Sequence, residues 1–234
     1  MAYRDVVMAD SPIAYWRLGE PSGTAAEDET GTYDGIYANG PTLGVAGLIT
    51  GDANTAVTFG GGQYVNLGGG PSVSSAAFSA EIWLKFNDTS TVSQVFWEFY
   101  EVAGSLPGWG LGLNMLGSAT NKLGYWSDGN AAWRESTGTI TDSNRHYVVV
   151  TQQSGTGNRI FYIDGVEAGT DASSVHPSVW AGFKYISLQG TLDEAAVYQS
   201  ELSAAQVLAH YNAGITAPAS GPPIRATTTG LRFS

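Results

Sequence analysis

The chain has 234 residues, of which 43% are hydrophobic and 13% are charged, and its formal net charge is −11. An apolar fraction of this size excludes wholesale disorder, and the acidic balance argues against nucleic acid and anionic membranes as partners. The sequence contains no Cys, which excludes disulfides and thiol catalysis. The charge suits cations, neutral sugars or a basic protein surface, although solubility alone would also explain it.

Residues 1–16 show no basic start followed by a long apolar core, so no signal peptide is expected. The chain also lacks an apolar run of about 18 residues, the length that a membrane-spanning helix needs. No insertion into a membrane is therefore expected.

The first predicted strands lie in the N-terminal third of the chain. In residues 13–18 apolar side chains fall on alternate positions, as in a half-buried strand. A polar, glycine-rich loop is expected over residues 19–35. Residues 56–59 and 64–67 flank the glycines 60–62, and this arrangement predicts a hairpin with a glycine turn.

The clearest strand covers residues 78–86. Its apolar side chains recur at every second position and face the core, while the other face carries mostly polar groups and Trp83. Two more strands are expected at 95–100 and 109–115. In the second of these, two glycines share one face, which often means that something packs close to the backbone.

The same pattern continues through the C-terminal half. Further strands are expected at 123–126, 131–134, 147–151, 159–163, 183–188 and 192–198. Residues 127–130 (SDGN) predict a turn between the first two, and Asp164-Gly165 predicts a tight turn after 159–163.

One helix is predicted near the C-terminus. Ser203 and Gln206 form a capping box, and Gly214 is placed to end the helix. After that glycine, residues 215–234 are rich in Pro, Gly, Ala and Thr and are expected to form a tail, either frayed or docked on a neighbour. Residues 1–214 are therefore expected to form one domain, an all-β, two-sheet antiparallel sandwich with one short helix.

Six segments, in this order and spacing, resemble the laminin G-like jelly-roll domains of the concanavalin A-like lectin/glucanase superfamily. They are 14–28 (AYWRLGEPSGTAAED), 51–67 (GDANTAVTFGGGQYVNL), 78–86 (FSAEIWLKF), 145–153 (RHYVVVTQQ), 160–169 (IFYIDGVEAG) and 192–214 (LDEAAVYQSELSAAQVLAHYNAG). The resemblance covers residues 5–214 and is weakest over 87–143.

The resemblance implies a binding module of the kind found in secreted, surface and bacteriophage virion proteins. We expect a non-catalytic adhesion module, a minor tail or surface decoration protein of a virion, that binds a cell-surface glycan. An extracellular or cell-surface location is the alternative. A purely structural virion component, which assembles with itself or with other virion proteins and binds no sugar, is a second interpretation, and a secreted glycan-active enzyme is a third.

Retaining glucanases of the superfamily carry two carboxylates on one strand, about 5 Å apart. The similar strand here offers Glu81, but Trp83 and Lys85 follow on the same face. Glu98 and Glu101 are the other acids considered, and nothing in the sequence ties them to Glu81. We therefore expect no catalytic residues.

Aromatic and polar residues gather around the predicted 127–130 turn, in the manner of a sugar site. The expected ligand-binding residues are Trp83, Tyr125, Trp126, Asp128, Asn130 and Trp133. The alternative is that these rings fill the sandwich or an interface between subunits.

Domains of this kind often hold a structural Ca²⁺ with one acid of the N-terminal loop and one of the LDE segment. By position these are Asp28 and Asp193. Loop carbonyls would complete the six to eight oxygens that calcium takes. Equally, the two acids could cap turns without a metal.

Overall fold

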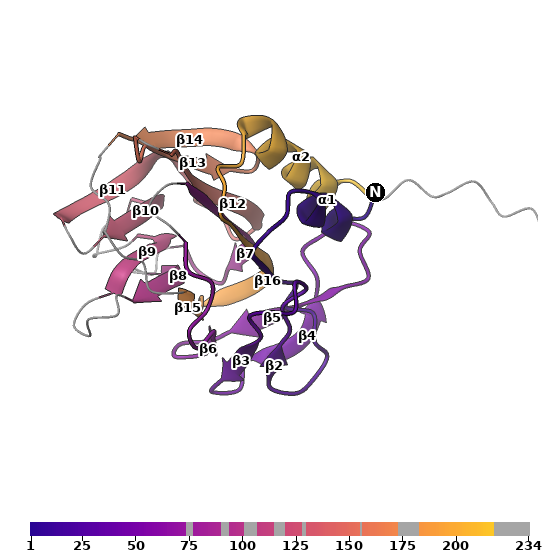
Figure 1. The fold of residues 1–234 in the computed structure, drawn as a ribbon. Coiled ribbons are helices and arrows are strands. Elements are labelled where there is room, and N and C mark those ends of the chain that lie inside the picture. Colours follow the sequence, from indigo (N-terminus) through magenta and orange to yellow (C-terminus); the bar gives the residue numbers. More distant parts are fainter. Residues whose placement is uncertain are drawn as a thin grey trace, which may run out of the picture.

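The computed structural model describes residues 1–73, 77–89, 94–100, 107–114, 120–127, 130–154, 156–172 and 183–217. The described chain folds into two stacked antiparallel sheets with two helices beside one of them (Figure 1). This confirms the predicted all-β jelly-roll sandwich. Most of the predicted tail lies outside the described residues, so the boundary after residue 214 stays a prediction.

The first sheet is built around β7. In sheet order its strands are β14 (Val166–Asp171), β13 (Arg159–Ile163), β12 (Arg145–Gln152), β7 (Phe78–Phe86), β16 (Gly190–Tyr198), β5 (Thr55–Phe59) and β4 (Thr42–Ala46), and β1 (Ala14–Trp16) also pairs with β16. The predicted Asp164-Gly165 turn joins β13 to β14, and both of its residues have a positive φ, as a two-residue hairpin turn requires.

The second sheet holds the remaining strands. In sheet order they are β11 (Asn130–Thr139), β10 (Lys122–Ser127), β9 (Pro107–Leu113), β8 (Gln94–Tyr100), β15 (Phe183–Ile186), β6 (Tyr64–Asn66), β3 (Gly35–Ala38) and β2 (Ala25–Ala26).

The predicted hairpin around the glycines 60–62 is wrong. A turn is present, since the Gly60 carbonyl accepts from the Gln63 amide, but β5 belongs to the first sheet and β6 to the second. The glycine turn thus carries the chain from one sheet to the other, and alternation alone cannot tell such a crossing from a hairpin. The expected 19–35 loop likewise contains the short strand β2, and β3 and β4 follow it.

The main core lies between the sheets. It is lined by the inward-facing side chains of both, among them Trp16, Phe59, Phe78, Ile82 and Phe161, all fully buried. Burial of this apolar surface is the dominant favourable contribution to folding.

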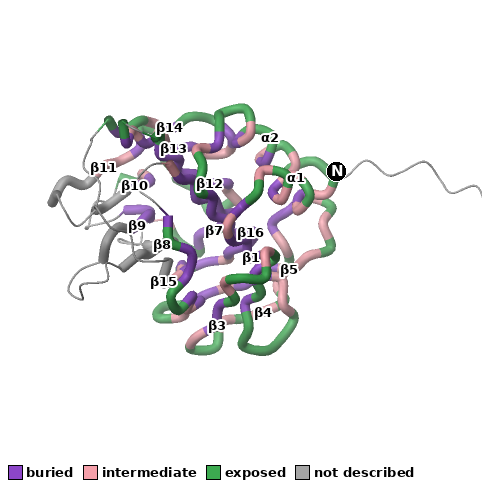
Figure 2. Tube along the Cα trace, viewed as in Figure 1, coloured by how far each residue is buried: buried purple, intermediate pink, exposed green. Residues whose placement is uncertain are grey.

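A second apolar layer covers the outer face of the first sheet. Helices α1 (Tyr3–Ala9) and α2 (Ala204–Ile215) lie side by side over it (Figure 1). The layer contains Tyr3, Val7, Tyr15, Leu48, Ile49, Trp83, Tyr147, Val149, Tyr162, Ala196, Tyr198, Leu202 and Val207. Both faces of β7 are therefore buried (Figure 2). Lys85 is its one exposed residue.

Helix α2 confirms the predicted helix and its capping box: the Ser203 hydroxyl accepts from the Gln206 amide. Its end differs from the prediction, because Gly214 lies inside the helix and is buried. A Cβ at that glycine would come within 2.2 Å of the Trp83 ring. The glycine thus serves close packing between helix and sheet rather than helix termination.

Helix α1 was not predicted. Tyr3 and Val7, four residues apart, form its buried stripe. That spacing was visible in the sequence, but a stripe of two residues in a short segment gives no reliable helix signal. Neither helix of the described chain has the length and apolar character needed to cross a membrane.

The close approach of Gly214 to Trp83 predicts a packing cost. We expect Gly214→Ala to lower the free energy of unfolding by about 1–3 kcal/mol, because a methyl group would force the ring or the helix to move. Chemical denaturation measures this. Asn212→Ala, an exposed change in the same turn, is the control, and an equal effect of both variants would contradict the prediction.

Candidate functional site

A row of paired positions crosses the outer face of the second sheet. Ile36 in β3 pairs with Asn66 in β6, and Asn66 pairs with Tyr185 in β15. Tyr185 also pairs with Glu98 in β8, which in turn lies opposite Gly110 in β9. The sequence neighbours of Ile36, Asn66 and Tyr185 belong to the main core, so these three side chains face outward.

Two tyrosines form the centre of this surface. The rings of Tyr64 and Tyr185 meet edge to face with centroids 4.8 Å apart, and both side chains are half-buried. Beside them lie the half-buried amide of Asn66 and the side chain of Ile36, which is 60% exposed. An aromatic pair with an amide at its edge and an apolar neighbour suits the faces and hydroxyls of a sugar. We call Ile36, Tyr64, Asn66 and Tyr185 the tyrosine platform.

Two loops hold one end of the platform in place. The Gln63 amide group donates to the Gly40 carbonyl at 3.0 Å, and the Asn39 amide group donates to the Gly62 carbonyl at 2.7 Å. These bonds join the turn before β6 to the turn after β3. The platform is therefore preorganised, which lowers the entropic cost of binding.

Four of the six predicted ligand-binding residues lie at the other end of the same sheet. Tyr125 and Trp126 lie in β10, Asn130 and Trp133 lie in β11, and Asp128 lies outside the described residues. The pairing of Ser127 with Asn130 confirms the predicted turn. Trp126 pairs with Gly110, the last member of the row described above. The structure describes no side chains for these residues, so their part in binding stays a prediction.

Trp83, the remaining predicted ligand-binding residue, lies in the first sheet, and its predicted role in binding a ligand is wrong. Its side chain is fully buried in the layer beneath the helices. The indole N–H donates to the Tyr3 hydroxyl at 3.0 Å, and the ring stacks on Tyr211 of α2 with centroids 5.9 Å apart. Because both helices cover this face of the sheet, Trp83 is not available to a ligand.

Glu81, the acid considered for catalysis, is also fully buried. Its carboxylate accepts a short hydrogen bond from the Tyr147 hydroxyl and one of 2.9 Å from Tyr198. The third contact is His210 Nδ1 of α2 at 2.9 Å, and the other ring nitrogen of His210 lies 2.9 Å from an Asp10 oxygen. These residues come from distant segments of the chain, so no local sequence pattern groups them.

Two carboxylates set the charge of His210. Burial disfavours the charged ring, but Glu81 and Asp10 outweigh burial and raise the pKa of His210 to about 9. Only the doubly protonated ring donates to both acids at once. We call Asp10, Glu81 and His210 the buried triad.

A second buried ion pair lies where β16 changes partner. Residues 190–192 pair with β5 and residues 195–197 with β1, and Glu194 lies between them with a φ of 52°. The Arg17 guanidinium contacts Glu194 at 2.6 Å and Asp52 at 2.9 Å, and Tyr15 donates a short hydrogen bond to Glu194. Burial raises the pKa of Glu194 to about 7, although Arg17 opposes this rise. The arrangement anchors the strand crossing.

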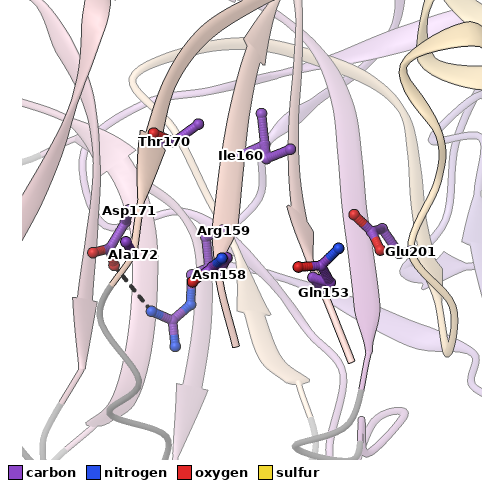
Figure 3. Close-up of a pocket in the computed structure, with 8 residues that line it drawn as sticks. All are labelled: Gln153, Asn158, Arg159, Ile160, Thr170, Asp171, Ala172 and Glu201. Carbon is purple, nitrogen blue, oxygen red and sulfur yellow. Dashed lines mark hydrogen bonds and ion pairs between the residues drawn. The ribbon is translucent and has the colours of Figure 1, made fainter. Parts of the chain in front are cut away.

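A cleft opens at the far end of the first sheet (Figure 3). Its volume is about 200 Å³, and it lies where β13 begins and β14 ends, beside the segment that precedes α2. The residues that line it include Gln153, Asn158, Ile160, Thr170 and Glu201. No local pattern predicts this cleft, because it joins three separate segments of the chain.

The profile of the concanavalin A-like lectin/glucanases superfamily matches residues 59–208. The chain belongs to this superfamily. No curated relative matches it in sequence.

Solved structures share the lectin/glucanase-like fold at low identity. Trypanosoma rangeli sialidase in complex with sialic acid has a TM-score of 0.60 and 15% identity over 85% of this chain, which spans only 32% of the sialidase chain. Domain 4 of AbnA, a GH43 extracellular arabinanase from Geobacillus stearothermophilus, in complex with arabinotriose, has a TM-score of 0.60 and 17% identity over 86% of this chain and 98% of that domain.

A third structure of this fold binds a protein. The binding domain of botulinum neurotoxin DC in complex with rat synaptotagmin II has a TM-score of 0.60 and 13% identity over 87% of this chain and 51% of that one. The structures that share this fold thus include complexes with carbohydrates and a complex with a protein.

The calcium site expected from the superfamily does not fit Asp28. Its two oxygens accept from the backbone amides of Tyr15, Thr30, Thr32 and Tyr33 and from the Thr30 hydroxyl. These donors point at the positions that a cation would need. Among the described residues no group of three or more His, Cys, Asp or Glu side chains is arranged to hold a metal ion.

Asp193 differs from Asp28. One of its oxygens accepts from the Leu48 amide at 2.7 Å, and the other is buried with no hydrogen-bond partner. Burial, reinforced by Glu194, raises the pKa of Asp193 well above its usual value. Asp28 therefore binds the backbone of the N-terminal loop, whereas Asp193 binds the Leu48 amide, and the two acids have separate structural roles.

Asp28 gives the next prediction. Asp28→Asn should lower the free energy of unfolding by about 1–3 kcal/mol, because an amide group would face N–H donors. The loss should be equal in calcium and in a chelator, as measured by thermal unfolding. Glu27→Gln, an exposed neighbour, should change little. A calcium-dependent stabilisation of the wild type that Asp28→Asn abolishes would restore the calcium role.

The buried triad predicts loss of stability at alkaline pH. His210 titrates near 6.5 when unfolded and near 9 when folded. Its contribution is therefore complete below about pH 6.5 and is lost as pH rises through about 9, a change of about 3 kcal/mol at roughly 1.4 kcal/mol per pKa unit.

Urea unfolding between pH 6.5 and 9.5 measures this change. Asp10→Asn removes one of the two acids and should move the loss to lower pH, whereas His210→Gln should flatten it. A wild type whose stability does not fall over this range, or a His210→Gln variant that falls just as steeply, would contradict the assignment.

Proposed function

We propose that the chain is a non-catalytic binding module that presents the tyrosine platform to a carbohydrate. The observation that carries this proposal is the edge-to-face pair of Tyr64 and Tyr185 on the outer face of a regular sheet, with Asn66 beside it. Rings supply the apolar contact for a sugar face, and the amide supplies both a donor and an acceptor for hydroxyls. The net charge of −11 favours a neutral sugar over an acidic one.

The state of Glu81 supports the non-catalytic part of the proposal. Retaining glycosidases place two accessible carboxylates about 5 Å apart on either side of the bond that is cleaved. Here the carboxylate is sealed beneath two helices and accepts hydrogen bonds from Tyr147 and Tyr198. A substrate would have to displace the helical layer to reach it.

The similar structures agree with the proposed ligand class without fixing it. Two of them are complexes with sialic acid and with arabinotriose, and the third is a binding domain in complex with a protein. A location in a virion, and assembly with itself or with other virion proteins, stay predictions of the resemblance. The native mass of the intact protein distinguishes an assembly component from a monomeric lectin.

The platform gives a direct binding prediction. We expect a glycan array to identify neutral glycans that bind, and Tyr64→Ala and Tyr185→Ala each to weaken that binding about tenfold, the equivalent of about 1.4 kcal/mol. Tyr64→Phe keeps the ring and should retain most of the affinity. Titration calorimetry with the best array ligand measures the effect.

The matched control is Val166→Ala, which trims an apolar side chain that is 67% exposed on the first sheet. Trp126→Ala and Trp133→Ala test whether the predicted cluster at the other end of the second sheet takes part. If both tyrosine variants fold normally and bind like the wild type, the platform is not the binding site. If no glycan on the array binds, the proposed function is wrong.

A further inference from the structure

We propose that the cleft between β13, β14 and the segment before α2 is a second ligand site, which takes one uncharged sugar ring. For its class of ligand this inference rests on the proposed carbohydrate-binding function. Its residues are separate from the tyrosine platform. The cleft of about 200 Å³ is smaller than the roughly 300–1,000 Å³ of sites for drug-sized ligands, so it suits a single ring rather than a chain of sugars.

The lining supplies what a sugar needs. Ile160 and Thr170 pair across β13 and β14 and are half-buried and exposed, respectively, which places an aliphatic surface beside a hydroxyl. Gln153 and Asn158 add amide groups from the loop before β13, and Glu201 adds a carboxylate from the segment before α2 (Figure 3). Donors and acceptors around an apolar patch match the mixed surface of a sugar ring.

The cleft is held rigid by an ion-pair cluster at one wall. Arg159 is fully buried and contacts Asp171 at 3.1 Å, and Arg134 of β11 contacts the same carboxylate at 3.0 Å. In the neighbouring loop, the backbone N–H of Gln153 donates to the backbone carbonyl of Asn158 at 2.8 Å. The wall and the loop therefore keep their positions whether or not a ligand is present, which lowers the cost of binding.

The charges around the cleft favour an uncharged ligand. Two guanidinium groups, of Arg134 and Arg159, stand against two carboxylates, of Asp171 and Glu201. The formal charges balance locally, although the chain as a whole carries −11. Neither an acidic nor a basic ligand gains a net Coulombic attraction there, whereas hydroxyl groups gain hydrogen bonds from charged partners.

The two sites lie on opposite faces of the sandwich. Ile160 packs against the apolar layer beneath the helices, on the outer side of the first sheet, and the platform occupies the outer side of the second sheet. Binding at one site is therefore separable from binding at the other, and amide resonances near each site report it independently.

The test is an amide NMR titration of the full chain with glucose, galactose and N-acetylglucosamine, and separately with glucosamine and glucuronate. We expect at least one neutral sugar to shift the amides of Gln153, Thr170 and Ala172 saturably. Thr170→Val removes a hydroxyl, and Glu201→Gln replaces a charged acceptor with a neutral amide, so each should weaken this binding about 3- to 10-fold. Glu167→Gln, an exposed acid on the same strand β14, should leave it unchanged.

Three results would overturn the inference. They are shifts confined to the second sheet, stronger binding of glucosamine or glucuronate than of any neutral sugar, and equal effects of Glu201→Gln and Glu167→Gln. Tyr64→Ala keeps the two proposals apart. If that variant loses glycan binding while the cleft amides never respond, the cleft proposal fails and the platform stands. If no sugar binds at either site, both fail.

Discussion

The carboxylate of Glu81, buried at the centre of β7, constrains the rest of the structure. A charge in that position is tolerated only with full hydrogen bonding and a counter-charge, and Tyr147, Tyr198 and His210 provide both. His210 in turn needs Asp10, which follows α1. One acid in the sheet therefore ties residues near both ends of the described chain to its outer face.

This constraint decides where binding can occur. Replacing a buried ion pair with well-packed apolar groups is often neutral or stabilising. The triad therefore fixes the position of the helices, and its stabilising contribution depends on His210 staying protonated. Its consequence is that the outer face of the first sheet, around Trp83, is permanently occupied. The surfaces left for ligands are the second sheet and the uncovered end of the first.

Local pattern predicted most of the sandwich because β7 alternates clearly and β12 carries a run of apolar, β-branched residues. The features that local pattern did not predict depend on contacts between distant segments of the chain. The polar face of β7 resembled a surface, since nothing in the sequence shows that α1 and α2 cover it. Part of the tyrosine platform could have been predicted, because the alternation of residues 64–67 places Tyr64 and Asn66 on one face. The contribution of Tyr185 could not, because only the register between β6 and β15 brings it beside them. Asp28 drew attention as a calcium ligand, and the structure surrounds its carboxylate with five hydrogen-bond donors, which no local pattern predicts.

The placement of the two proposed sites bears on how such a module would work. Each offers contact for about one sugar ring, and small contacts of this kind bind weakly because the loss of rotational and translational freedom offsets them. A single short glycan cannot reach both sites, since they face away from each other across two sheets. Useful affinity would therefore come from simultaneous binding of separate glycans, or from several copies of the module, each of which raises the effective concentration for the next contact. On a dense glycan surface, a rigid two-faced sandwich favours attachment through many weak contacts over one tight contact.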